Sequence, residues 1–453
     1  GKFEGIGARL QRKNEQVHII EIIPGGPVWR DNLLKVGEII LKVAQKDEDP
    51  IEIGNMRLDD AVNLIKGPKG TKVYLTVKKV DGIIEEVEII RDVVELEESY
   101  AKSSLIIKDS NKYGLIELPQ FYIDFDDYSN RNAAIDVKKE INQLKEKDVQ
   151  GIIIDLRNNG GGSLKTVVDI TGYFIKDGPV VQVKSTGGRK EILRDNDSSI
   201  IWEGPLVILV NEFSASASEI LAAALQDYKR AIVLGSKQTF GKGTVQNMVD
   251  LNRIISGSTY GDLGAVKLTT DKFYRINGGS TQLEGVKSDV VILDRYSYID
   301  LGEKDQENPL SWDYIEPTTF DFWHYEIDYK SMLERSENRM KSSQYISLID
   351  EQAKWVKQQQ DEYDYTLNYN NLYQEKEFEK KKINKFKKLN EFESGLQFEW
   401  LPEPGKKLIN KEITLRRNRW IKSLKADFYI DEATNILEDL NSKNYNKLAQ
   451  LKK

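Results

Sequence analysis

Cysteine is absent from the sequence, which excludes disulfide bridges, thiolate metal ligands and a cysteine nucleophile. Histidine is nearly absent, because the 453 residues include only His18 and His324. We expect these two side chains to lie in different domains, so a Ser-His-Asp triad or a multi-histidine metal site would have to be built from one of them. A catalytic base is therefore expected to be lysine, aspartate or glutamate, and His18, in a strand-like run, is expected to be structural.

Long hydrophobic runs and an excess of positive charge are also missing. No apolar stretch approaches the roughly 18 residues that a membrane-spanning helix needs. Lysine and arginine total 66 against 73 aspartates and glutamates, a formal net charge of −7, which argues against a nucleic-acid-binding protein. The chain begins with glycine and has no signal-like segment, so we interpret it as a trimmed or mature fragment.

Glycine and proline are scarce in the last third of the chain. Only two of 32 glycines lie after residue 302, and only two of 11 prolines lie after Pro317. The composition of this part predicts long helices, broken near 402–405. We interpret its lysine-rich stretch 376–388 as a solvated helix face, with a docking patch for an acidic partner as the alternative. The length allows about three domains of roughly 150 residues. We place them at 1–95, 96–300 and 301–453.

The first of these ranges has the pattern of a small β-rich domain. Strands are predicted at 72–80 and 83–91, around the hairpin signal Asp81-Gly82, and a short helix is predicted at 56–65. A lone Gly-x-Gly, as in Glu4-Gly5-Ile6-Gly7-Ala8, is most typical of a tight turn. Together with Ile22-Ile23-Pro24-Gly25-Gly26 and the elements that follow, this segment resembles a PDZ domain. The resemblance implies a carboxylate-binding loop at Ile6, Gly7 and Ala8 and an apolar pocket beside Val62 and Ile65.

The middle of the chain predicts a layered, mixed α/β core, because helices alternate with strands that are apolar throughout. Helices are predicted at 134–145, 164–174 and 216–228, and buried strands at 151–156, 205–210 and 231–234. One buried strand leads into Asp155-Leu156-Arg157-Asn158-Asn159-Gly160-Gly161-Gly162. Glycines at a helix entrance leave backbone N–H groups free for an anion or an oxyanion, although a flexible connection is the alternative. A phosphate-binding loop is disfavoured, because no Gly-Lys-Ser/Thr follows.

A second segment, Asn211-Glu212-Phe213-Ser214-Ala215-Ser216-Ala217-Ser218-Glu219, runs from a strand into a helix. It presents Ser216 at the positive end of the helix, where a nucleophile is accessible. Ser216 and Glu219 also have the spacing of a capping box, so a purely structural role is the alternative.

A third segment, Thr239-Phe240-Gly241-Lys242-Gly243-Thr244-Val245-Gln246, carries a lysine between two glycines. Such a lysine is usually a surface residue. A lysine that acts as a base must be neutral, and burial lowering its pKa by about 3 units from 10.4 would make half of the molecules competent at pH 7. Gln246 lies four residues after Lys242, so its oxygen has the spacing to orient the amine.

In this order after a PDZ-like module, the three segments resemble the tail-specific (C-terminal processing) serine proteases. The resemblance extends from residue 1 to about 292, and 427–433 is similar to the C-terminal helical region of the longer periplasmic members. It implies a crotonase-like core. The longer members also have a helical domain before the PDZ domain, which this sequence does not show, so the resemblance supports the interpretation of the chain as a fragment. It further implies a Ser-Lys dyad of Ser216 and Lys242 with Gln246 assisting, and an oxyanion hole of the Gly162 and Ala217 N–H groups. The loop 235–239 is one residue longer than the family pattern, which makes Lys237 a formal rival of Lys242.

The resemblance also implies an activity. The chain is expected to be an endopeptidase that forms an acyl-enzyme, without metal or cofactor, and acts on periplasmic proteins with free, apolar C-termini. The PDZ domain would select these termini, ligand binding there would move it and permit catalysis, and a lipoprotein adaptor is a possible partner. Two rival hypotheses are a catalytically silent peptide-binding scaffold and a hydrolase of esters or cell-wall peptides.

Overall fold

The computed structural model describes residues 2–13, 15–23, 26–79, 82–95, 99–124, 127–255, 261, 263–323, 329–361, 366–401 and 411–451. Four features of the sequence analysis lie outside them: Pro24-Gly25, Asp81, His324 and the helix break at 402–405. The chain forms two compact units, Gly1–Tyr100 with Lys407–Arg416 and Ala101–Lys406 with Arg417–Lys453.

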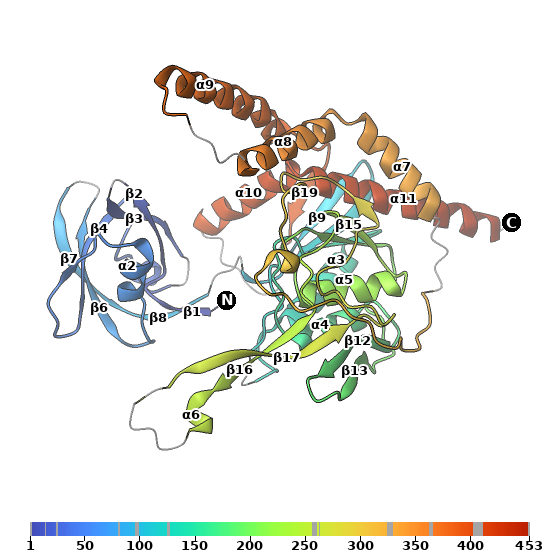
Figure 1. The fold of residues 1–453 in the computed structure, drawn as a ribbon, viewed down its shortest axis with the longest axis horizontal. Coiled ribbons are helices and arrows are strands. Elements are labelled where there is room, and N and C mark those ends of the chain that lie inside the picture. The colour runs from blue at the N-terminus through green and yellow to red at the C-terminus, as the bar shows by residue number, and fades with distance from the viewer. Residues whose placement is uncertain are drawn as a thin grey trace. The chain divides into compact units, whose positions relative to one another are not determined.

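The smaller unit is built on an antiparallel sheet with the strand order β2-β3-β4-β6-β7, and β5 pairs with β4 (Figure 1). Two further strands, β1 and β8, pair with each other. The strands are β1 Lys2–Gly5, β2 Ala8–Lys13, β3 Gln16–Ile22, β4 Ile39–Gln45, β5 Ile51–Glu52, β6 Lys72–Lys78, β7 Ile84–Ile90 and β8 Asp92–Glu95. The helices are α1 Pro27–Arg30 and α2 Leu58–Ile65.

The predicted hairpin and helix of this unit are present. β6 and β7 pair antiparallel over their whole length, and the Lys79 N–H closes the turn onto the Ile83 carbonyl at 2.7 Å. Helix α2 begins two residues later than predicted, because Arg57 is extended, with φ −61° and ψ 145°. The apolar face of α2 packs Ala61 and Ile65 into the core of the sheet.

The larger unit contains a seven-stranded sheet with the order β18-β15-β14-β11-β10-β9-β19. Adjacent strands run parallel from β10 through β11, β14 and β15 to β18, whereas β9 is antiparallel to both of its neighbours, β10 and β19. They are β9 Lys102–Lys108, β10 Asn111–Glu117, β11 Ile152–Asp155, β14 Leu206–Val210, β15 Ile232–Gly235, β18 Val290–Val291 and β19 Gln397–Trp400. The carboxyl ends of β11, β14 and β15 therefore meet at one edge of the sheet.

Both faces of this sheet are covered, as the apolar strands predict. Ile152 and Ile154 of β11 point into the cluster under the helices of one face, and Ile153 points into the cluster under the C-terminal helix on the other. The first face carries α3 Ala133–Glu146, α4 Leu164–Gly172 and α5 Ala217–Asp227. The core is thus a layered, mixed α/β fold.

A second, four-stranded sheet has the order β13-β12-β17-β16. Its strands are β12 Gly178–Ser185, β13 Lys190–Asp195, β16 Thr244–Asp250 and β17 Ala265–Tyr274. The short helix α6, Leu251–Ile254, follows β16 directly, and the β16–β17 ribbon runs out from the rest of the unit (Figure 1).

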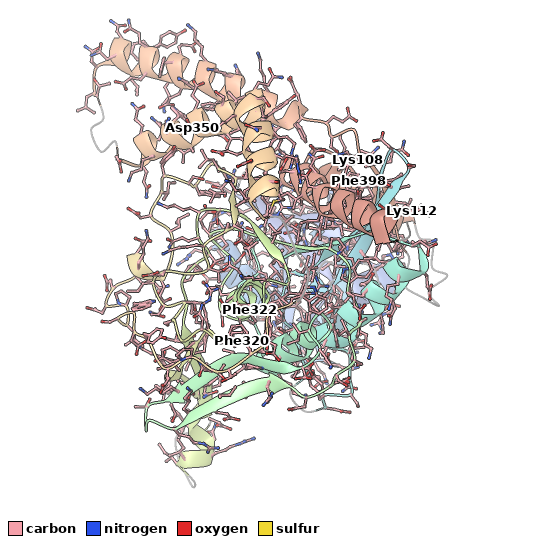
Figure 2. The ribbon with its side chains drawn as sticks, turned by 90° about the vertical axis from the view of Figure 1, so that its right-hand side faces the viewer. Lys108, Lys112, Phe320, Phe322, Asp350 and Phe398 are labelled. Atoms are coloured by element: carbon pink, nitrogen blue, oxygen red, sulfur yellow. The ribbon has the colours of Figure 1, made fainter. Side chains whose placement is uncertain are left out.

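The C-terminal part is helical, as predicted, but it also supplies a strand of the core. Its elements are η2 Glu303–Asp305, α7 Tyr329–Ser342, α8 Gln344–Asp361, α9 Tyr369–Phe386, η3 Lys387–Glu391, α10 Lys411–Lys425 and α11 Phe428–Leu451. Strand β19 pairs with β9 and packs Phe398 against the same cluster as α11 (Figure 2). None of the described helices is long and apolar enough to cross a membrane.

The lysine-rich face lies on α9 and η3. Lys382 and Lys385 both pair with Glu351 of α8, and Lys376 and Lys380 pair within their own helix. The pairs of Lys376 and Lys380 join residues three apart on one helix surface, whereas those of Lys382 and Lys385 join two helices.

Candidate active site

Ser216 lies in the turn that joins β14 to α5. β14 ends at Val210 and α5 begins at Ala217, so the serine stands just before the helix. Its backbone has φ 58° and ψ −112°, whereas a helix N-cap normally adopts an extended conformation. A non-glycine residue at positive φ is strained, and such strain is concentrated at active sites. The conformation therefore favours a reactive serine over one that serves only as a cap.

The Glu219 carboxylate joins the serine turn to the lysine loop. One of its oxygens accepts hydrogen bonds from the N–H groups of Ser216, at 2.8 Å, and Lys242, at 3.0 Å. The other accepts from the Thr239 hydroxyl at 2.6 Å and the Gly241 N–H at 2.7 Å. Burial raises the pKa of Glu219 to about 7, although all four donors act to lower it. The capping-box spacing in the sequence predicted the hydrogen bond from the Ser216 N–H to Glu219. Nothing in the sequence predicted the bonds from Thr239, Gly241 and Lys242.

The Lys242 amine lies beside Gln246, as their spacing predicts. Its Nζ donates a hydrogen bond to Oε1 of Gln246 at 3.1 Å. Burial lowers the pKa of Lys242, and repulsion from Lys267 lowers it further, while Glu303 and Glu219 act in the opposite direction. A lowered pKa increases the neutral fraction of the amine, which is the form that can accept a proton.

The pH dependence of the reaction should report this lysine. We expect kcat/KM to rise about tenfold per pH unit up to the pKa of Lys242, since only the neutral amine is competent. Lys267→Ala removes a repulsive charge, raises the pKa of Lys242 and shifts the profile to higher pH. Lys272→Ala, on the same strand but paired with Asp313, is the matched control and leaves the profile in place. A shift to lower pH in Lys267→Ala would contradict the assignment.

Ser216 Oγ and Lys242 Nζ, both in the described part of the chain, are not hydrogen-bonded to each other. Hydrogen bonds between catalytic groups are often long in free enzymes and shorten with substrate bound. The backbone nitrogens of Ser216 and Lys242 are nevertheless held close together, because both N–H groups donate to the same Glu219 oxygen. The rival Lys237 is exposed, and Glu219 binds the backbone of Lys242, not that of Lys237.

The glycine loop lies against the serine turn. A Cβ on Gly161 would stand 2.8 Å from the Ser216 Cβ and 3.1 Å from the Ala217 nitrogen, so only glycine fits there. Gly162 has φ 141°, and a Cβ on it would lie 2.2 Å from the Phe121 carbonyl oxygen. Within the described residues, neither the Gly162 nor the Ala217 N–H donates a hydrogen bond to the protein. Both predicted oxyanion donors therefore lack a protein acceptor in the described part of the chain.

In the smaller unit, the five predicted ligand-binding residues line one groove. Ile6 and Gly7 from the loop before β2, and Ala8 at the start of β2, line it together with Val62 and Ile65 of α2, around a volume of about 240 Å³. Strand β2 is an edge strand of its sheet, so its outer backbone groups can pair with an added strand. Gly7 has φ 82°, and a Cβ there would lie 3.0 Å from the Gly26 Cα. The loop and the edge strand have the arrangement that PDZ domains use for C-terminal peptides.

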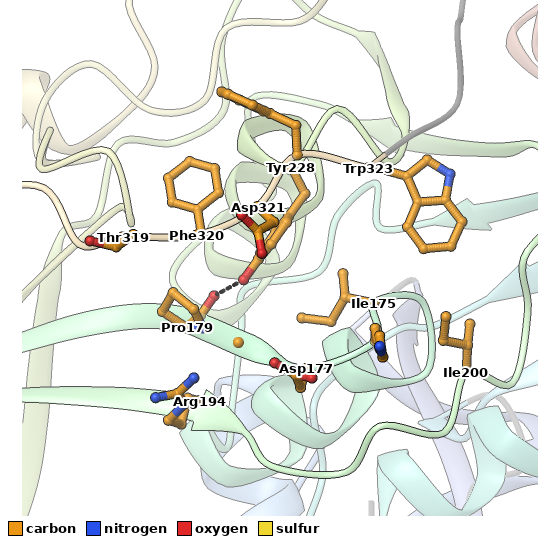
Figure 3. A pocket seen from close by; sticks show the side chains of 13 residues that line it. Ile175, Asp177, Pro179, Arg194, Ile200, Tyr228, Thr319, Phe320, Asp321 and Trp323 are labelled. Carbon is orange, nitrogen blue, oxygen red and sulfur yellow. Dashed lines mark hydrogen bonds between the residues drawn. The ribbon is translucent and has the colours of Figure 1, made fainter.

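The larger unit contains a further cavity of about 550 Å³ (Figure 3). Tyr228 and Phe320 line it, with ring centroids 5.2 Å apart, and the Tyr228 hydroxyl donates to the Pro179 carbonyl at 2.9 Å. None of the predicted site residues lines this cavity. Among the residues that the structure describes, no group of three or more His, Asp or Glu side chains is placed to hold a metal ion.

Comparisons with known proteins identify the class. A PDZ domain model matches residues 2–78, a peptidase family S41 model matches 112–292, and the C-terminal domain of tail specific protease matches 296–442. All three models belong to one class of protein, the serine-type peptidases that carry a PDZ domain. The chain belongs to the tail-specific proteases of peptidase family S41, which confirms the resemblance found in the sequence.

Two curated relatives illustrate the match. The tail-specific protease of Haemophilus influenzae is 39% identical over 319 residues, which are 70% of this chain and 44% of that protein. The carboxy-terminal processing protease CtpA of Bacillus subtilis is 32% identical over 289 residues, covering 64% and 56%. The chain thus spans about half the length of these relatives. Among solved structures, the peptide-bound PDZ domain of a Vibrio cholerae carboxy-terminal protease is 41% identical, covers 21% of this chain and 100% of that one, and has a TM-score of 0.21.

Proposed function

We propose that this chain hydrolyses peptide bonds through an acyl-enzyme formed on Ser216, with Lys242 as the general base. The observation that carries the proposal is the Glu219 carboxylate, which binds the backbones of both residues through one oxygen. The strained serine turn and the lowered pKa of Lys242 support it further. Family membership supports the same chemistry.

In this mechanism neutral Lys242, oriented by Gln246, takes the proton of the Ser216 hydroxyl as that oxygen attacks the scissile carbonyl. The oxyanion of the tetrahedral intermediate accepts hydrogen bonds from the Gly162 and Ala217 N–H groups. The protonated lysine then gives its proton to the leaving amine, and the acyl-enzyme forms. Water, deprotonated by the same lysine, releases the product acid.

The substrates that we propose are unfolded proteins with free, apolar C-termini. The groove of the smaller unit supports this class, because most of its lining residues are apolar and it lies between α2 and the edge strand β2, where PDZ domains bind C-terminal peptides. For the intact protein we propose a periplasmic location, and a lipoprotein adaptor that delivers substrates.

The groove can be tested by peptide binding and by cleavage. Val62→Asp places a carboxylate beside the apolar pocket. Because a bound apolar side chain would desolvate that charge, we expect the affinity for an apolar-tailed peptide to fall by about tenfold or more. Fluorescence anisotropy measures the affinity, and an unfolded protein with the same tail measures cleavage. Val36→Asp makes the same change at a residue that is 54% exposed and outside the groove, and should bind normally.

Amidation of the substrate's C-terminus separates the proposal from its rivals. A protease that selects free C-termini cleaves the amidated substrate more slowly, and Val62→Asp removes the difference. Binding without any cleavage would support the silent scaffold. Cleavage of esters or cell-wall peptides with no preference for a free terminus would support the other hydrolase.

A further inference from the structure

Arg157, five residues before Gly162, joins the glycine loop to the C-terminal helix α11. Its guanidinium binds Asp155, the last residue of β11, with Nη2 to Oδ2 at 2.6 Å and Nε to Oδ1 at 2.9 Å. The same group binds Asp427, 270 residues away in sequence, with Nη2 to Oδ2 at 2.7 Å and Nη1 to Oδ1 at 3.2 Å. It also lies over the Tyr429 ring, 5.3 Å from the centroid.

This contact is shielded from water. The side chains of Arg157 and Asp427 are only 17% and 20% exposed, and they line a cavity of about 520 Å³ at the carboxyl edge of the seven-stranded sheet. Burial would lower the pKa of Arg157, but the carboxylates of Asp155 and Asp427 outweigh it and raise the pKa well above the usual value. A bidentate pair in such a place fixes geometry more strongly than an exposed ion pair.

The residues that follow Arg157 connect the glycine loop to the serine turn through hydrogen bonds. The Asn158 N–H donates to Oδ1 of Asn211 at 2.9 Å, and the amide of Asn211 donates back to the Asn158 side chain at 2.9 Å. Asn211 is the first residue after β14, in the segment that leads to Ser216.

Asn159 makes the second connection. Its side-chain oxygen accepts the Gly161 N–H at 2.9 Å, and its backbone carbonyl accepts the Ala215 N–H at 3.0 Å and the Ser218 hydroxyl at 2.9 Å. One short segment therefore holds both sides of the oxyanion site: the glycine loop through the side chain of Asn159, and the serine turn through its backbone.

We propose that Asp427 is a positioning residue for the oxyanion site, and that it acts through Arg157 to set the placement of the Gly162 and Ala217 N–H groups. The inference rests on the proposed function and adds a role for the C-terminal segment. The C-terminal segment is thus more than a cover for the sheet, because the residue just before α11 supplies the carboxylate that fixes the glycine loop. Asp427 touches no reacting atom in this scheme.

Asp427→Asn isolates the ion pair from the helix cap. Oδ1 of Asp427 also accepts the N–H groups of Tyr429, at 2.9 Å, and Ile430, at 3.3 Å, and asparagine caps a helix as well as aspartate does. The variant therefore keeps the cap and loses the charge. We expect kcat on an apolar-tailed unfolded substrate to fall about 10²-fold with KM unchanged, since small misplacement of a catalytic group has that cost.

A matched control lies on α11. Glu438 pairs with Lys108 of β9, Oε2 to Nζ at 2.5 Å, at a contact between α11 and the sheet that does not involve the glycine loop. Glu438→Gln removes a similar ion pair and should keep the parental kcat. Arg157→Lys loses the bidentate geometry, and its effect should not add to that of Asp427→Asn, because both act through one contact.

A second readout does not depend on activity. Hydrogen exchange of the peptide that spans 158–162 should become faster in Asp427→Asn and stay unchanged in Glu438→Gln. The inference is overturned if Asp427→Asn keeps the parental kcat, if Glu438→Gln loses as much, or if KM rises while kcat stays constant. If the parent protein cleaves nothing, the proposed function fails, and unchanged exchange in Asp427→Asn would still separately refute the positioning role.

Discussion

Ser216→Ala and Lys242→Ala are each expected to lower kcat by about 10⁴-fold or more on an apolar-tailed unfolded substrate, because either change removes a group that forms or breaks bonds. The double variant should be no slower than the single ones, since the nucleophile and the base act as a unit. Product formation followed by gel electrophoresis or mass spectrometry measures the rates.

Two further lysine variants sharpen this test. Lys242→Arg keeps a positive charge, but arginine is not deprotonated in proteins, so it should be as inactive as Lys242→Ala. Lys237→Ala, at the exposed rival lysine, should retain the parental rate. Equal fragment yields from the parent, Ser216→Ala and Lys242→Ala would end the Ser-Lys mechanism, and loss of activity in Lys237→Ala alone would assign the base to that lysine.

Replacing Glu219 is expected to have the second largest effect. Glu219→Gln offers one oxygen in place of two, so its amide group must face either the N–H groups of Ser216 and Lys242 or the donors of Thr239 and Gly241. In either orientation the NH₂ group of the glutamine faces two hydrogen-bond donors and cannot accept from them. We expect kcat to fall about 10²- to 10³-fold, and the free energy of unfolding to fall by about 1–3 kcal/mol.

Glu140 provides the control for Glu219. It is another buried carboxylate, 5% exposed, and accepts the Ser103 hydroxyl at 2.5 Å outside the proposed site. Glu140→Gln should lower the thermal midpoint without lowering kcat at temperatures where the protein is folded. A Glu219→Gln variant with unchanged kcat would show that the carboxylate does not hold the dyad.

The local features of the site could be predicted from the sequence. The spacing of Ser216 and Glu219 predicted the capping-box hydrogen bond from the Ser216 N–H to the Glu219 carboxylate, which is present at 2.8 Å. The i, i+4 spacing of Lys242 and Gln246 predicted their contact, which is present at 3.1 Å. Both features depend on residues that are close in the chain, where spacing and backbone geometry restrict the outcome.

The contacts between distant segments could not be predicted in this way. Glu219 binds donors 20 to 23 residues away, and nothing in the spacing shows that the lysine loop returns to the first turn of α5. Strand β19 was missed for a related reason: its four residues, Gln397–Trp400, are too few for a periodic signal and become a strand only by pairing with β9.

The sequence by itself determined which chemistry was open to this protein. With no cysteine and two histidines, it left lysine and carboxylates as bases, and its apolar runs fixed a core of buried strands and covering helices. The tertiary structure decided which of those groups meet. The order of the strands brings the ends of β11, β14 and β15 to one edge, and there Glu219 joins the serine to the lysine, while Asp427 reaches Arg157. Such contacts depend on the packing of whole layers, and local propensity carries no information about that packing.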